Sequence, residues 1–165
     1  MNIEDITKTE NSISERMPKG GCFEERHDYL LTNGIYSEWS GVFEQYVELA
    51  LGGNTEALKR SLFFLWYQCS EPNQLSGLSD LNEQLIEKIL RMVANQAKGS
   101  ALDLEMQFML PYYFQVCSWY FERFSKLDAL TNQSLTNTEL WQTEAAKQSW
   151  AHRGIMGDYW SSKGL

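Results

Sequence analysis

The sequence predicts an all-α protein, a single compact domain of five to seven helices around an aromatic-rich central helix. Apolar residues recur at helical spacing through most of the chain. Valine and isoleucine are few and almost never alternate with polar residues, as they would in a half-buried strand. With 165 residues and a hydrophobic content of 43%, the chain can bury one core without disulfides or metal ions.

The first 21 residues are mostly polar and charged, and we expect them to form a poorly ordered or extended N-terminal arm. The single helical domain is then expected to cover residues 22–165. No apolar run in the arm has the length of a secretory signal. The longest apolar run of the chain, residues 62–67, is too short to cross a membrane, so we expect no membrane association.

Two helices are expected first in the helical domain. One covers residues 23–31 and ends where Gly34 can adopt a left-handed conformation. The other covers residues 37–51, with Ser37 as its N-cap and a pair of glycines after its last turn. The apolar residues of this second helix share one broad face, which predicts that it packs on the core.

A third helix is expected to begin after Asn54, whose side chain can cap it, and to end before a loop at residues 70–74. Its apolar residues again fall on one face. Lys59 and Arg60 are expected on the opposite face, in contact with water.

A fourth helix is expected over residues 80–97, because Asp80 and Glu83 have the spacing of a capping box. Its leucines and isoleucines form a clear apolar stripe. Asn82 is the one polar residue that interrupts the start of this stripe.

A fifth helix is expected over residues 102–124, where Pro111 either bends the helix or starts a new one. Residues 112–121 are apolar on almost every side, so this segment is predicted to be the central helix. A last helix is expected over residues 136–153. The aromatic residues of the tail, residues 155–165, indicate that it packs back on the domain.

Motifs that carry chemistry are scarce. Phosphate-binding glycine loops and a serine nucleophile motif are missing, and the three cysteines have no metal-binding spacing and indicate free thiols in a reducing cytoplasm. Glu24 and His27 form a Glu-x-x-His pair, but the only other histidine, His152, belongs to no second such pair. Asp103 and Glu105 are explained as acids in the first turn of a helix. We therefore expect no catalytic residue, cofactor or metal ion.

Charge is the more informative feature. The chain has 22 acidic and 14 basic residues, a net charge of −8, which disfavours binding to nucleic acid. Between Glu24 and Glu56 there are seven acids and a single base. Glu38, Glu44 and Glu48 lie on one helix opposite its apolar face. They form either a solvated face that keeps the protein in solution or the docking residues for a basic partner.

The sequence thus favours a small acidic cytoplasmic protein that docks a basic partner protein and is not an enzyme. Its size, its acidity and its lack of catalytic motifs would suit an immunity or antitoxin-like protein that neutralises a basic nuclease, an analogy based on composition alone. The alternative is a helical enzyme or small-ligand-binding bundle with its site in the aromatic centre.

Overall fold

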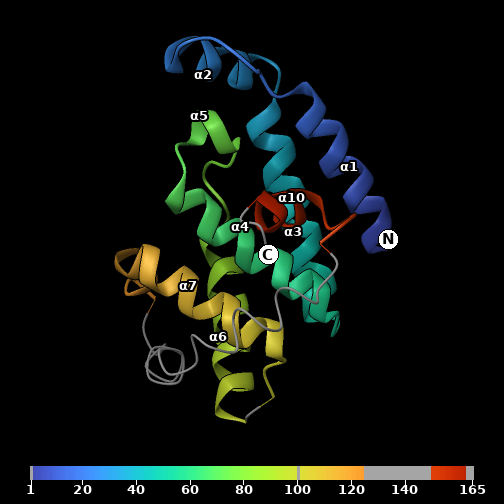
Figure 1. The fold of residues 1–165 in the computed structure, drawn as a ribbon, viewed down its shortest axis with the longest axis vertical. Coiled ribbons are helices and arrows are strands. Elements are labelled where there is room, and N and C mark those ends of the chain that lie inside the picture. The colour runs from blue at the N-terminus through green and yellow to red at the C-terminus, as the bar shows by residue number, and fades with distance from the viewer. Residues whose placement is uncertain (1, 100, 125–149, 163–165) are drawn as a thin grey trace.

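The computed structural model describes residues 2–99, 101–124 and 150–162. Every regular element in these ranges is an α-helix, which confirms the predicted all-α class (Figure 1). The described helices are α1 (Ile3–Arg16), α2 (Phe23–Thr32), α3 (Ile35–Leu51), α4 (Thr55–Ser70), α5 (Asn73–Ser76), α6 (Glu83–Lys98), α7 (Leu104–Phe121) and α10 (Gly154–Ser162). They exceed the expected five to seven because α1, the short α5 and α10 were not predicted as helices from the sequence. No helix in the described ranges is long and apolar enough to cross a membrane.

Helix α4 is the most deeply buried helix of the described part. Ten consecutive residues, Ala57–Trp66, are buried, because α3, α6, α7 and α10 all pack against it. Lys59 and Arg60 belong to this buried run, so the prediction that they contact water is wrong. Figure 1 shows α10 near the middle of the molecule, and it packs on both α1 and α4.

Aromatic side chains from α4, α7 and α10 form the predicted aromatic-rich core. The Trp66 ring stacks on the Tyr113 ring with centroids 5.0 Å apart and meets the Tyr159 ring edge-on at 4.8 Å. The outer side of α7 is not covered in the same way. Trp119 is 58% exposed, so the segment predicted as the central helix is not covered on every side, as a central helix would be. The non-helical φ/ψ angles within α7 occur at Cys117 and not at Pro111, which lies inside the helix.

Residues 3–16 form the helix α1, so the expectation of an extended or poorly ordered arm is wrong for them. Asn2 caps the helix by accepting a hydrogen bond from the Asp5 N–H at 2.9 Å. Ile6 and Ile13 are completely buried, and α1 packs along α3. A stripe of isoleucines at helical spacing is therefore enough to dock an otherwise polar segment.

The remaining boundaries agree with the predictions to within a few residues, but two caps differ. Helix α3 begins at Ile35 after Gly34, so Ser37 lies inside the helix and the prediction that it is the N-cap is wrong. Helix α6 begins after Asn82 rather than after Asp80, and the Asn82 side chain accepts a hydrogen bond from the Gln84 N–H at 3.0 Å. The expected helix over residues 136–153 lies largely outside the described residues. The tail does pack back, since Met156 and Trp160 of α10 are fully buried.

Candidate functional site

Seven ionisable side chains form a continuous series of alternating charge beside α4, which we call the ion chain. They come from α1, α4, the start of α7 and the segment before α10. In order along the series they are Asp103, Lys59, Glu105, Arg153, Glu56, Arg60 and Glu10.

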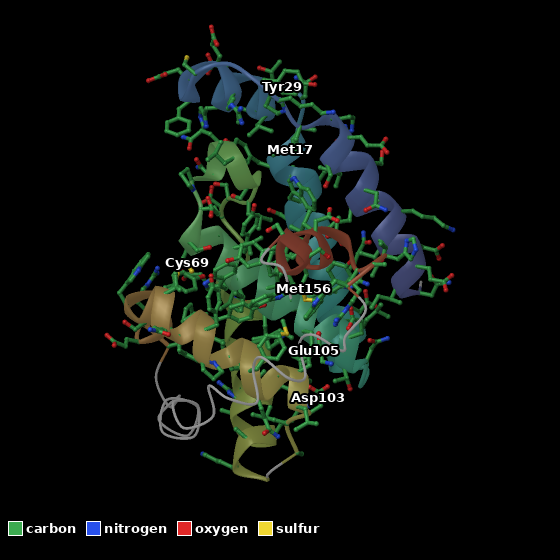
Figure 2. All side chains as sticks on the ribbon, in the orientation of Figure 1. Met17, Tyr29, Cys69, Asp103, Glu105 and Met156 are labelled. Carbon is green, nitrogen blue, oxygen red and sulfur yellow. The ribbon has the colours of Figure 1, made fainter. Side chains whose placement is uncertain are left out.

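The outer end of the ion chain lies at the start of α7. The Lys59 Nζ is 2.7 Å from Asp103 Oδ2 and 2.7 Å from Glu105 Oε2. Arg153 donates from Nη1 to the other oxygen of Glu105. Asp103 also caps α7 by accepting from the Met106 N–H at 2.8 Å, which agrees with its predicted role at a helix start. In the view of Figure 2, Asp103 and Glu105 lie below α10.

Glu56 joins the two halves of the ion chain. Its Oε1 accepts from Arg60 Nε at 2.9 Å and from Arg153 Nε at 2.8 Å. The Arg153 guanidinium also lies over the Trp150 ring, 4.8 Å from the centroid. One carboxylate thus links α4 to the segment that leads into α10.

The inner end of the ion chain is the most buried. Arg60 donates from Nη1 to the Thr7 Oγ1 at 2.6 Å and to the Tyr46 hydroxyl at 2.9 Å. Tyr46 in turn donates to Glu10, which is only 1% exposed. The other oxygen of Glu10 accepts the backbone N–H of Ile155, in the first turn of α10.

Gly154 allows this close approach between α1 and α10. Its φ angle is +61°, in the left-handed region that favours glycine. A Cβ atom at this position would also collide with the Glu10 carboxylate. The glycine therefore lets the carboxylate reach the start of α10.

Glu10 and Glu56, the two glutamates that pair with Arg60, have pKa values shifted in opposite directions. Burial raises the pKa of Glu10 to about 7, although its hydrogen bonds from Tyr46 and Ile155 act in the other direction. Burial also acts to raise the pKa of Glu56, but the hydrogen bonds and charges of Arg153 and Arg60 outweigh it and lower that pKa overall. With a pKa of about 7, Glu10 changes its protonation state near neutral pH.

We expect the free energy of unfolding to fall as the pH rises from 4.5, the ordinary pKa of a glutamate, to about 7, the pKa of Glu10 in the folded protein. A carboxyl whose pKa is higher in the folded protein than in the unfolded chain favours folding at low pH, and this contribution is lost as the pH passes the folded value. Between the ordinary value of 4.5 and about 7, the loss amounts to about 3 kcal/mol. Urea unfolding at a series of pH values measures it. In Glu10→Gln, which cannot ionise, the decrease over this range should disappear. An equal decrease in both proteins would contradict the assignment.

The ion chain is suited to holding helices together. Each of its carboxylates lies against at least one cation, and within the described ranges no group of three or more potential ligands could hold a metal ion. Breaking such a buried pair exposes an uncompensated charge to a poorly solvating interior. We therefore interpret the ion chain as a structural framework that holds the helices in place.

The three acidic residues predicted as a docking face do not all have the same surroundings. Glu38 forms an ion pair with Arg16 of α1, and both side chains are about two-fifths exposed. Glu44 and Glu48 are exposed and make no ion pair with any described residue. Only the last two therefore present an uncompensated charge to the solvent.

The Glu24 and His27 pair is not arranged as a metal site with other described residues. The His27 Nδ1 lies 3.0 Å from the Tyr36 hydroxyl, a hydrogen bond that joins α2 to α3. Glu24 and His27 both line a cleft between α2 and α5.

Sequence reasoning did not identify the ion chain. Glu10 interrupts a stripe of isoleucines at helical spacing, and Lys59 and Arg60 follow a buried alanine and leucine. These positions carried a signal, because charges on an apolar face need partners. The identity of the partners was not visible, since Arg153 lies about 90 residues further along the chain.

The chain was also compared with known proteins. No protein-family model matches it, and neither a curated protein nor a solved structure was found to be similar.

Proposed function

We propose that this protein is a small cytoplasmic interaction module that docks a basic partner protein through the acidic face of α3. The observation that supports this is a long segment without an exposed base. Between Arg26 and Lys88 the only basic residues are Lys59 and Arg60, and both are buried in the ion chain. The exposed acids of the same segment are Asp28, Glu38, Glu44, Glu48, Asp80, Glu83 and Glu87.

Burial of the two cations changes what this part of the surface presents. If Lys59 and Arg60 contacted water, as the sequence pattern indicates, they would offset part of the negative charge of α3. Inside the protein they are paired with carboxylates instead. A surface of one charge sign raises the local concentration of oppositely charged partners and speeds their association. This favours a basic protein as the partner.

We expect the double variant Glu44→Lys, Glu48→Lys to fold normally but to associate with its partner about tenfold more slowly at low salt. Its stability should stay within about 1 kcal/mol of the original protein, because exposed charges contribute little. The partner is captured from the native lysate, and association rates are then measured at two salt concentrations.

The matched control is the double reversal Glu4→Lys, Glu122→Lys, which changes the net charge by the same amount at exposed positions on α1 and after α7. It should retain partner capture and most of the association rate. Capture that is equal for both double variants, or no basic partner with the original protein, would contradict docking through α3.

The alternative was an enzyme or ligand-binding bundle with its site in the aromatic centre. The described rings of that centre contact one another, as in the stack of Trp66 on Tyr113 and the edge-on contact of Tyr112 with Trp160. Rings that fill the space between helices are typical of a packed core. The described residues therefore give this alternative no support.

A further inference from the structure

A small cleft lies between α2 and α5, at the end of the molecule that is uppermost in Figure 1. It has a volume of about 220 Å³ and is lined by Phe23, Glu24, His27, Asp28 and Gln74. Pockets for drug-sized ligands usually have at least about 300 Å³. The cleft is therefore of a size for one long side chain rather than for a complete small molecule.

The α2 residues of the cleft share one face of that helix. Helical geometry, about 100° per residue, places Leu31 on the same face as Phe23 and His27. Phe23 is 52% exposed and Leu31 is 63% exposed, although both are large apolar residues. Leu75 of α5, next to the lining residue Gln74, is exposed as well. Exposed apolar residues thus lie on the cleft-lining face of α2 and next to the lining residue of α5.

The charge of the cleft is negative, and no described base is paired with it. Glu24 and Asp28 are exposed and form no ion pair within the described ranges. Arg26, the one base of α2, is directed elsewhere, since its Nε donates to the Gly21 carbonyl at 3.4 Å. His27 has one ring nitrogen engaged with the Tyr36 hydroxyl of α3, a hydrogen bond that restrains the imidazole where it lines the cleft.

We propose that this cleft receives an arginine side chain of the basic partner, with apolar residues of the same partner segment packed on Leu31 and on Leu75. This rests on the proposed function and names the chemistry of the partner. A guanidinium can stack on an exposed phenylalanine ring and donate to carboxylates at the same time. Phe23 supplies the ring, and Glu24 and Asp28 supply the carboxylates. Lysine fits less well, because its ammonium cannot stack or form a planar bidentate contact.

The test uses the full chain labelled with ¹⁵N and a defined probe, the capped tripeptide acetyl-Leu-Arg-Leu-amide. We expect saturable chemical-shift changes centred on Phe23, His27 and Gln74. The peptides acetyl-Leu-Lys-Leu-amide and acetyl-Leu-Gln-Leu-amide should bind progressively more weakly. Asp28→Asn should weaken binding of the arginine peptide about fivefold, the largest effect of one exposed ion pair. Phe23→Ser should weaken it to a similar extent, and circular dichroism verifies that both variants are folded.

The matched control is Glu4→Gln with Glu122→Gln, which removes two exposed charges on α1 and after α7, outside the cleft, and should leave peptide binding unchanged. Equal shifts with the arginine and glutamine peptides, or binding unaffected by Asp28→Asn and Phe23→Ser, would overturn the assignment of the cleft.

The cleft and the proposed function can fail separately. If Asp28→Asn and Phe23→Ser leave capture of the basic partner unchanged while Glu44→Lys, Glu48→Lys abolishes it, the cleft proposal is overturned and docking through α3 stands. If the arginine peptide binds in the cleft but no basic partner is captured, the proposed function fails and the cleft remains a site for cationic side chains.

Discussion

Trp66→Ala is expected to lower the free energy of unfolding by about 3–5 kcal/mol, because it removes the ring that joins the aromatic residues of α4, α7 and α10. Trp66 is 2% exposed, so the cavity left behind is enclosed by its former neighbours. Urea unfolding followed by circular dichroism measures the change. The near-ultraviolet signal of the remaining aromatic residues should weaken as their packing loosens.

Trp119→Ala is the matched control, since it deletes the same atoms from α7 at a position that is mostly exposed. The expected loss is below about 1 kcal/mol, as for other surface substitutions. The sequence alone would place Trp119 in the core as well, so the expected effect of Trp119→Ala differs between the sequence pattern and the structure, whereas that of Trp66→Ala does not. A large loss at Trp119 together with a small loss at Trp66 would contradict the packing described for α7 and α4.

Arg60→Met is expected to destabilise the protein by about 3–5 kcal/mol, the usual effect of removing one partner of a buried ion pair. Methionine keeps most of the apolar stem and removes the guanidinium. The side chain of Glu56 then loses one of its two cations, and the Tyr46 hydroxyl and Thr7 lose a donor. Thermal and urea unfolding of the purified variant provide the measurement.

Arg91→Met serves as the control for this substitution, because Arg91 is exposed on α6 and has no ion pair with a described residue. It should change the stability by no more than about 0.5 kcal/mol. If Arg60→Met were equally mild, the ion chain would not contribute to the stability of the fold.

The local features of the fold were predictable from the sequence. Asn54 caps α4 through the Ala57 N–H, and Gly52 follows the last turn of α3, as the pattern indicates. Such signals act over one or two turns of helix and are read directly from neighbouring residues. The cap of α6 was displaced by two residues, because Asp80 adopts a positive φ angle of 53° and Asn82 supplies the oxygen instead.

What could not be predicted depends on contacts between distant residues. Glu10 makes α1 appear less amphipathic than it is, because the carboxylate that interrupts its apolar stripe is neutralised by groups on α3, α4 and α10. Lys59 and Arg60 were assigned to water for the same reason. Of the predicted docking residues, Glu38 has a cation from another helix beside it, whereas Glu44 and Glu48 have none among the described residues. Periodicity shows which face a residue occupies, but not which other element covers that face.

The ion chain also has a consequence for the order in which the protein matures during synthesis. Arg60 can meet Thr7, Tyr46 and Glu56 as soon as the first third or so of the chain has left the ribosome. Arg153 and the Ile155 N–H are made much later, and until then Glu105 and Glu10 each lack one of their hydrogen-bond donors. Since domains assemble as their segments emerge, the nascent chain holds a partly neutralised interior until α10 has been synthesised. Completion of this part of the fold is thereby coupled to the appearance of Arg153 and Ile155, long after the rest of the ion chain has been made.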